Sequence, residues 1–244
     1  MTQKCILEDK RKGGCASCPA QCQHRIALLG LNGNGGRVGA AGVPKDYRYY
    51  TLANSPAREG QAKIYGQLAQ YVATFERQFD VEADRIKSLY LVSESPGTGK
   101  TTSAASLLNE YLAAHYIGSL KRGLQPEQRP AMFLDVNSWQ TDYNLASMTN
   151  DDAGLEKVTA TMRKAMSVDF LVMDDVGIRT ATEAFKSLVH AVINARTTNS
   201  LPTIYTSNLA ISEMETVFDA RLADRMRDQC LTLHFAGASK RGRR

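Results

Sequence analysis

The chain lacks any apolar run long enough to span a bilayer, and its N-terminus lacks the apolar core of a signal peptide. The lack of such a run and of such a core excludes a membrane-spanning protein and a protein secreted through a signal peptide. After residue 22 the chain has a single cysteine, Cys230. We therefore expect a soluble, cytoplasmic protein without membrane contact.

Composition limits the number of domains. With 244 residues, of which 43% are hydrophobic, the chain can bury one core of about 200 residues and carry a small appendage. The net charge of +5 is uneven, because residues 1–25 and 240–244 are basic while the remainder is slightly acidic. Basic ends suggest contact with phosphate backbones, although solvated tails explain such runs equally well.

A phosphate-binding loop follows the apolar run of residues 89–92. Its backbone N–H groups would bind the β-phosphate of ATP, Lys100 would reach the β and γ oxygens, and Thr101 would offer its hydroxyl to Mg²⁺. Side chains at Gly97 or Gly99 would block that approach. The predicted cofactor-binding residues are Ser95, Pro96, Gly97, Thr98, Gly99, Lys100, Thr101 and Thr102.

One position departs from the GxxxxGK[ST] pattern of such loops, because Glu94 stands where the first glycine is expected. The residues that touch phosphate are all present, and the segment after them has helical apolar spacing. A chance glycine turn is the alternative, and the strand and helix on either side disfavour it. How Glu94 affects ATP turnover stays open.

Two carboxylates end a second apolar strand, in the sequence DFLVMDDVG of residues 169–177. Asp174 would hold Mg²⁺ through water, and Asp175 would orient or deprotonate the attacking water of a hydrolase. The alternative is an ordinary strand that ends in an acidic turn.

Strand-like and helical runs alternate through the rest of the chain, which predicts an α/β fold with a parallel five-stranded sheet. The expected strands are residues 89–92, 132–136, 170–173, 203–206 and 231–235. Asn208 follows the fourth strand, where the amide could hold the attacking water or sense the γ-phosphate. A helix cap is the equal alternative from spacing alone.

The remaining cysteines are Cys5, Cys15, Cys18 and Cys22. In a cytosolic chain this cluster predicts a tetrahedral Zn²⁺ site in a segment too poor in apolar residues to fold alone. His24 could replace Cys22, and redox cysteines or a disulfide are the alternatives. Cys230 fits a core position better than a ligand position.

These features predict three parts: a zinc-binding module at residues 1–29, a glycine-rich linker at 30–42 and an ATPase domain at 43–244. Six glycines and almost no bulky residue make the linker a flexible tether that cannot pack. The ATPase domain would begin with an apolar helical stripe formed by Ile64, Leu68, Tyr71, Val72, Phe75 and Phe79.

With these parts placed, nearly the whole chain resembles the AAA+ ATPases that load replicative helicases, the DnaC and DnaI type. The resemblance rests on GVPKDYRYYTLANSP (42–56), the phosphate loop, MDDVG (173–177), INARTTNSLPTIYTSNL (193–209) and ARLADRMRD (220–228). DnaI-like loaders also carry an N-terminal zinc module joined by a linker.

The resemblance implies roles for particular residues. Asn208 would be the sensor of the γ-phosphate, and Arg225 the arginine finger that reaches a neighbouring subunit, with Arg221 the weaker choice. Arg241 resembles a second sensor, although a basic tail is a serious alternative. A finger supplied in trans makes hydrolysis depend on self-association.

Such loaders hold single-stranded DNA on a helical element between the second and third strands, here residues 137–167. Trp139, Tyr143, Arg163 and Lys164 could supply stacking and phosphate contacts. Packing explains Trp139 at least as well, because it follows a strand end.

The resemblance thus implies an ATP-hydrolysing loader of the replicative DNA helicase, with the zinc module binding the helicase and the ATPase domain responding to ATP and single-stranded DNA. The nearest alternative is the IstB-like helper ATPase of DNA transposition, which the cysteine module disfavours. A small-molecule kinase and a nucleic-acid-binding zinc protein with a degenerate ATPase site are further alternatives.

Overall fold

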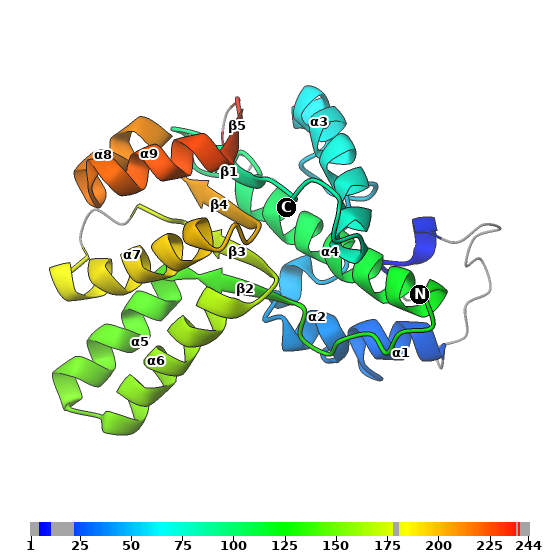
Figure 1. Cartoon of the computed structure of the whole chain (residues 1–244), viewed down its shortest axis with the longest axis horizontal. Helices are drawn as coiled ribbons and strands as arrows, with labels where there is room; N and C mark the ends of the chain where they lie inside the picture. Colours follow the sequence, from blue (N-terminus) through cyan, green and yellow to red (C-terminus); the bar gives the residue numbers. More distant parts are fainter. Residues whose placement is uncertain (1–4, 11–21, 178–180, 238, 240–244) are drawn as a thin grey trace. The chain divides into compact units, whose positions relative to one another are not determined.

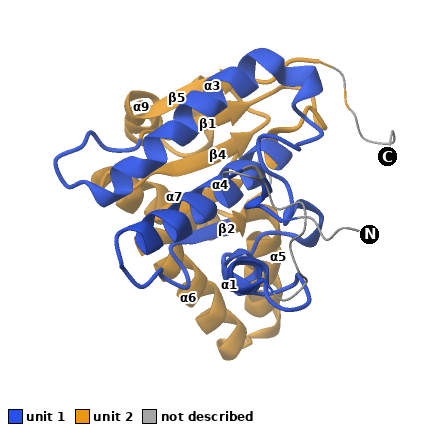
Figure 2. Cartoon of the chain, turned by 90° about the vertical axis from the view of Figure 1, so that its right-hand side faces the viewer, with its two compact units in different colours: residues 1–86, 102–133 blue, residues 87–101, 134–244 orange. Residues whose placement is uncertain are grey.

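A computed structural model describes residues 5–10, 22–177, 181–237 and 239 of the chain (Figure 1). It consists of two compact units, shown in blue and orange in Figure 2. Unit 1 comprises residues 1–86 and 102–133, and unit 2 comprises residues 87–101 and 134–244. The predicted boundaries at residues 29 and 42 therefore do not separate the compact units.

Unit 2 contains most of the sheet and the helices that follow its strands (Figure 1). Its elements are β1 (Ser88–Val92), the end of β2 (Ala131–Asp135), α5 (Val136–Thr149), α6 (Asp152–Ser167), β3 (Phe170–Asp174), α7 (Glu183–Thr198), β4 (Thr203–Ser207), the 3-10 turn η5 (Ile211–Glu213), α8 (Met214–Val217), α9 (Ala220–Gln229) and β5 (Cys230–His234).

The strands form one five-stranded sheet in the order β2-β3-β4-β1-β5. β1 pairs in parallel with β4 and with β5, and β3 pairs in parallel with β4. Strands β1, β3 and β4 are buried along their whole lengths, as expected for parallel strands covered on both faces. The predicted α/β fold with five strands is confirmed, and the carboxyl ends of parallel strands share the edge where ligands bind.

Side-chain caps begin three of the helices in unit 2. The carboxylate of Asp135 accepts the Ser138 N–H at the start of α5, and Asp219 accepts the Leu222 N–H at the start of α9. Thr182 caps α7 in the same way. Within the described part of the chain, no helix is both long and apolar enough to cross a membrane.

Unit 1 contains the N-terminal elements and most of the helix that follows the phosphate loop. These are the 3-10 turn η1 (Glu8–Lys10), α1 (Gln23–Leu29), α2 (Gly36–Ala40), the 3-10 turns η2 (Lys45–Tyr47) and η3 (Glu59–Gln61), α3 (Ala62–Ala73), the 3-10 helix η4 (Thr74–Phe79) and α4 (Lys100–Lys121). The predicted apolar stripe lies on α3 and η4, where Ile64, Leu68, Tyr71 and Phe75 are buried in the core.

The prediction of a flexible tether at residues 30–42 is wrong. This segment forms α2, and Val38 is fully buried. The buried Arg37 guanidinium donates to the carbonyls of Glu127, Ala27 and Pro126 at 2.7, 3.0 and 2.8 Å. Three bonds from one fixed side chain hold the segment against two other parts of unit 1.

Glycine itself explains why the segment packs. Gly36 has a φ of 61°, and a Cβ there would lie 2.4 Å from the backbone carbon of Leu28. A Cβ at Gly33 would lie 2.0 Å from the Tyr49 hydroxyl, which donates to the Gly33 carbonyl at 3.2 Å. The glycines therefore allow a close approach between backbone and neighbours that any side chain would prevent.

Candidate nucleotide-binding site

The phosphate loop joins the end of β1 at Val92 to the start of α4 at Lys100. Gly97 and Gly99 have φ values of 74° and 103°, in the left-handed region where glycine has no steric penalty. The loop therefore makes the tight strand-to-helix turn that its glycines predict.

Glu94 does not strain this loop. Its side chain is exposed, and it is not among the described residues with positive φ. The Ser93 hydroxyl donates to the carbonyl of Ser95 at 3.0 Å, and the Ser93 N–H donates to the carbonyl of Ser207 at 3.3 Å. The beginning of the loop is thus held to β4 without a glycine at position 94.

The other predicted loop residues differ in exposure. Ser95 and Pro96 are exposed, whereas Thr98 and Thr102 are buried. Thr102 is the first α4 residue that belongs to unit 1, where its carbonyl accepts the Ser106 hydroxyl at 2.8 Å.

Lys100 and Asn208 meet at the carboxyl edge of the sheet. Lys100 is only 7% exposed, and its Nζ donates to Asn208 Oδ1 at 2.8 Å and to the Ser93 carbonyl at 3.4 Å. A buried lysine needs such oxygen partners, and phosphate oxygens would satisfy it better because they are charged. The structure therefore brings two predicted site residues into direct contact.

Asp174 ends β3 next to two threonines. Its Oδ1 accepts the Thr206 hydroxyl at 2.6 Å, and its carboxylate also has a hydrogen bond with the Thr101 side chain. Burial raises the pKa of Asp174 to about 6, although these two hydrogen bonds oppose the shift. The carboxylate is therefore costly to ionise in the protein alone.

This pair of residues fits a magnesium ion. Thr101 and Asp174 supply hydroxyl and carboxylate oxygens, the ligands that Mg²⁺ prefers, and they lie within hydrogen-bonding reach of each other. A divalent cation at this place would favour the ionised carboxylate that burial disfavours. Thr101 and Asp174 are thus the residues that would hold it.

Asp175 has an unusual backbone for a residue with a side chain. Its φ is 64°, in the left-handed region, which costs about 1 kcal/mol or more and is frequent at functional sites. Its N–H donates to Thr206 Oγ1 at 2.8 Å, and its Oδ2 accepts the Asn137 amide at 2.8 Å. These contacts hold the carboxylate beside that of Asp174.

Sequence reasoning missed the roles of Thr206 and Asn137. The hydroxyl of Thr206 donates to Asp174 and accepts from the Asp175 backbone, so it fixes the carboxylate of Asp174 and the main chain of Asp175. Asn137 begins α5 just after β2. Each is a polar residue close to the carboxyl end of a strand, a local signal that marks a candidate but does not show which partner it will meet.

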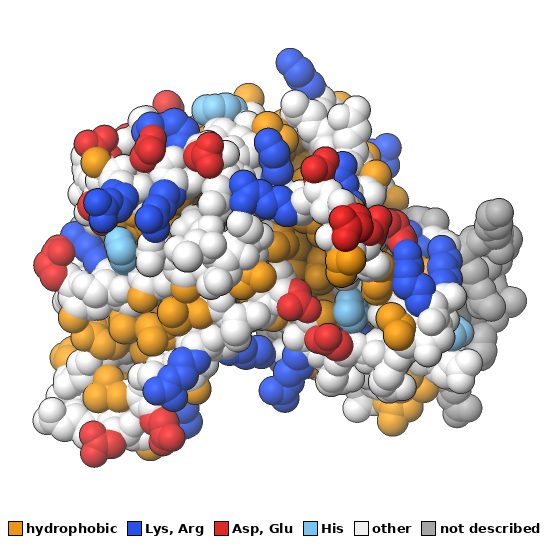
Figure 3. All heavy atoms as spheres, in the orientation of Figure 1, with side chains coloured by type: hydrophobic (Ala, Val, Ile, Leu, Met, Phe, Trp, Pro, Cys, Tyr) orange, Lys and Arg blue, Asp and Glu red, His pale blue; other side chains and the backbone are white. Residues whose placement is uncertain are grey.

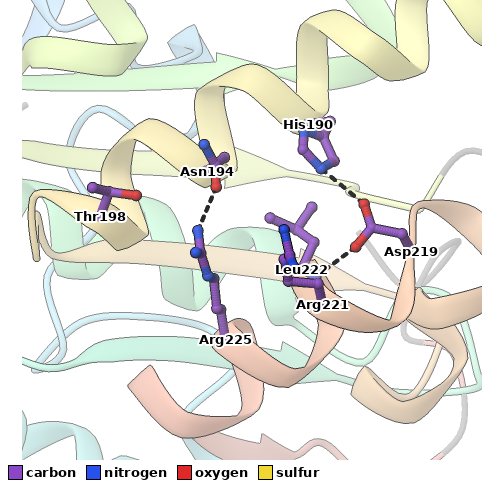
Figure 4. A pocket seen from close by; sticks show the side chains of 7 residues that line it. All are labelled: His190, Asn194, Thr198, Asp219, Arg221, Leu222 and Arg225. Atoms are coloured by element: carbon purple, nitrogen blue, oxygen red, sulfur yellow. Dashed lines mark hydrogen bonds and ion pairs between the residues drawn. The ribbon is translucent and has the colours of Figure 1, made fainter.

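The arginines predicted from the resemblance lie elsewhere. Arg225 and Arg221 line a cavity of about 440 Å³ between α7 and α9, which includes neither Lys100 nor Asp174 (Figure 4). Arg225 Nη1 donates to Asn194 Oδ1 at 2.6 Å. Arg241 lies outside the described residues.

The predicted zinc ligands are not brought together by the part of the chain that the structure describes. In that part no group of three or more His, Cys, Asp or Glu could hold a metal ion. Cys5 is buried, Cys22 directly precedes α1 without a side-chain capping bond, and the Nδ1 of His24 is 2.9 Å from the Tyr116 hydroxyl. Cys15 and Cys18 lie outside the described residues, so zinc remains a prediction.

The helical element at residues 137–167 forms the α5–α6 pair (Figure 1). Trp139 is buried, donates its indole N–H to the Val158 carbonyl at 3.3 Å and packs edge-on against Phe185. The packing alternative for this tryptophan is therefore confirmed. Arg163 on α6 is exposed.

Comparisons with known proteins agree with this geometry. The family model described as IstB-like ATP binding protein matches residues 143–244. The replicative helicase loader DnaC of Escherichia coli (strain K12) is 26% identical over 172 residues, which cover 69% of this chain and 59% of the relative. The DnaC of Buchnera aphidicola subsp. Acyrthosiphon pisum is 22% identical over 193 residues, which cover 78% and 68%.

Solved structures show the same fold. A crystal structure of the DnaC helicase loader matches with a TM-score of 0.56 at 18% identity, covering 79% of this chain and all of that one. A crystal structure of DnaI matches with a TM-score of 0.53 at 21% identity, covering 79% and 94%. The chain spans 59% of the length of the E. coli relative that it matches.

Proposed function

Because the family model, the curated relatives and the solved structures support a DnaC-like AAA+ family, we propose that this chain is an ATP-hydrolysing loader of a replicative DNA helicase. The convergence of Lys100, Asp174, Asp175 and Asn208 at one sheet edge carries the proposal.

Binding of ATP would change the partners of Lys100. The γ-phosphate oxygens would replace the amide oxygen of Asn208 on the Lys100 ammonium, because charged acceptors bind it more strongly. The amide of Asn208 would then be able to contact the γ-phosphate or the attacking water. This exchange makes Asn208 a sensor of the nucleotide state.

Hydrolysis would depend on the two aspartates in different ways. Asp174, with Thr101, would hold Mg²⁺, which neutralises charge on the phosphate oxygens when bound. Asp175 would accept a hydrogen bond from the attacking water through the carboxylate oxygen that does not bind Asn137. Thr206 holds the Asp174 carboxylate and the Asp175 backbone during this step, and Asn137 holds the Asp175 carboxylate.

The partners of the proposed loader are the replicative helicase, single-stranded DNA and further copies of the chain. The exposed Arg163 on α6 supports contact with DNA phosphates, as the sequence predicts. Arg225 supports self-association. The residues that line its cavity do not include Lys100, so an arginine finger at this position would act on the nucleotide of another copy of the chain. The N-terminal segment with its predicted Zn²⁺ site would bind the helicase.

Light scattering after size-exclusion chromatography tests the proposal. The chain is mixed with the replicative helicase of its own organism, with and without ATP and Mg²⁺. We expect a complex that is lost in the double variant Cys15→Ser with Cys18→Ser, and ATP hydrolysis that Lys100→Ala abolishes. The double variant must still bind Mg-ATP, so that the loss is not one of folding.

The loader proposal would be wrong if no complex with the helicase formed in any nucleotide state. If duplex DNA then assembled the chain into filaments, the transposition helper would replace it, and phosphate transfer to a small acceptor would instead identify a kinase.

A further inference from the structure

The cavity between α7 and α9 is lined by polar and charged side chains from both helices (Figure 4). Its volume of about 440 Å³ is within the range of ligand-binding pockets. On the face shown in Figure 3, basic side chains, a histidine and acidic side chains all lie over these two helices. The nucleotide-site argument uses none of the α7 side chains that line this cavity.

Arg225 is held at one end of its guanidinium. Its Nη1 donates to Asn194 Oδ1 at 2.6 Å, which ties α9 to α7. A guanidinium has five N–H donors in a rigid fork, and no second hydrogen-bond partner of Arg225 occurs among the described residues. The other end of the fork is therefore available to a ligand.

The one carboxylate in the cavity is already engaged. Asp219 accepts the Leu222 N–H at 2.8 Å and lies 2.9 Å from His190 Nε2. The backbone hydrogen bond from Leu222 is the main cause that lowers the pKa of Asp219, and His190 adds to it. Asp219 thus caps α9 and does not pair with Arg225, so positive charge and N–H donors dominate the cavity.

We infer that Asn194 is a positioning residue for Arg225 in an oxyanion site of phosphate chemistry. The amide oxygen holds one end of the guanidinium against α7, and the other end points at a phosphate oxygen. The inference rests on the proposed function, in which that phosphate belongs to the nucleotide of a second copy of the chain. Free phosphate shares the same chemistry.

An amide suits this task better than a carboxylate. Asn194 accepts a hydrogen bond without neutralising Arg225, so the full positive charge remains for the ligand. Thr198 lies one turn further along α7 and lines the same cavity, but no bond joins it to Arg225. Thr198→Ala is therefore a matched control for Asn194→Ala.

The first test follows the Arg225 side chain by NMR. The order parameter of its Nε–Hε group, assigned with Arg225→Lys, should be high in the wild type and in Thr198→Ala, and should drop in Asn194→Ala. Tripolyphosphate should shift this resonance at lower concentration in the wild type than in Asn194→Ala. An Arg225 that is equally mobile in wild type and Asn194→Ala overturns the inference. This readout requires no ATPase activity, so it decides the inference even if the proposed function fails.

The second test measures turnover against protein concentration. Asn194→Ala should lower the concentration-dependent part of ATP hydrolysis about fivefold, because a misplaced group loses catalytic effect. Its affinity for Mg-ATP should not change, and it should have no further effect in an Arg225→Ala background. Asn194→Asp should keep Arg225 ordered and still lose turnover, because it neutralises the charge. An equal loss in the Arg225→Ala background would show a merely structural role.

Discussion

Two segments of this chain contain glycines with left-handed backbone conformations and behave differently. In the phosphate loop, Gly97 and Gly99 adopt left-handed backbone conformations between a strand and a helix. In residues 30–42, Gly36 adopts the same conformation, but its Cα faces the backbone of Leu28. The first segment forms a cradle for a ligand, and the second allows two parts of the protein to pack closely.

The difference lies in what surrounds each glycine. The phosphate loop opens toward the buried Lys100 ammonium and a sheet edge with two carboxylates. The second segment includes Arg37, which takes the carbonyls of three other residues and so fills the space that a ligand would need. Glycine content alone does not distinguish a binding loop, a tether and a packing contact.

The largest expected effect is a loss of ATP turnover on substitution in the phosphate loop. Lys100→Ala removes the ammonium that would bind the β and γ oxygens, so ATP turnover should fall about 100- to 1,000-fold. Steady-state phosphate release measures it, and Lys63→Ala on the exposed side of α3 is the control. Retained turnover would show that the first segment is no more a nucleotide site than the second.

A substitution in residues 30–42 should instead change the free energy of unfolding. Gly36→Ala puts a Cβ 2.4 Å from the Leu28 backbone at a φ of 61°, so the free energy of unfolding should fall by about 3 kcal/mol. Denaturant titration measures this change. Mg-ATP affinity of the folded fraction should not change.

A second glycine provides the control. Gly66 lies inside α3, and a Cβ there meets nothing within 4 Å. Gly66→Ala should therefore stabilise the protein by about 0.5–1 kcal/mol through helix propensity. If Gly36→Ala and Gly66→Ala changed the free energy of unfolding in the same direction, the packing account of residues 30–42 would be wrong.

Asp174, at the end of β3 beside the phosphate loop, allows a test of the site by the pH dependence of stability. Because its folded pKa is raised from 3.8 to about 6, the native state binds this proton more tightly than the unfolded state. The group's contribution is most favourable below about pH 4 and is lost as pH rises through about 6. Above that pH, Asp174→Asn should raise the free energy of unfolding by about 3 kcal/mol, and the gain should vanish near pH 4.

Thermal unfolding from pH 4 to 8, without Mg²⁺, measures this gain. Glu156→Gln, at an exposed carboxylate of α6, is the control substitution. An Asp174→Asn gain that persists unchanged at pH 4 would contradict the burial argument.

A smaller effect than that of Lys100→Ala is expected for Asn137. Its amide holds Asp175 Oδ2 at 2.8 Å, so Asn137→Ala should lower ATP turnover about tenfold while Mg-ATP affinity stays the same. Thr141→Ala, one turn along α5, is the control. Faster turnover in Asn137→Ala would mean that the contact restrains Asp175 rather than positions it.

Sequence reasoning located the strands and the site residues that follow them, because apolar runs and polar strand ends are local signals. Lys100, Asp174, Asp175 and Asn208 were all found in this way, and the structure brings them together. Thr206 and Asn137 were overlooked because their roles depend on which strand lies beside which. That information is not present in any short window of sequence.

In the N-terminal segment, the sequence predicted less of the structure than at the sheet edge. Its cysteine spacing predicts a Zn²⁺ site, but two of the four ligands, Cys15 and Cys18, lie outside the described residues. Arg37 appeared as one charge within a glycine run, and its three carbonyl partners come from Ala27, Pro126 and Glu127. Contacts across about 90 residues cannot be read from composition.

The sequence by itself determined the order of strand, phosphate loop and helix and the chemical type of each residue at the sheet edge, because these follow from backbone preferences and covalent neighbours. Tertiary structure alone decided that one threonine hydroxyl joins both aspartates, that residues 30–42 pack instead of tethering, and that an α7 amide holds Arg225. These outcomes depend on side chains that meet only after the chain has folded, when burial makes each unmet hydrogen bond costly.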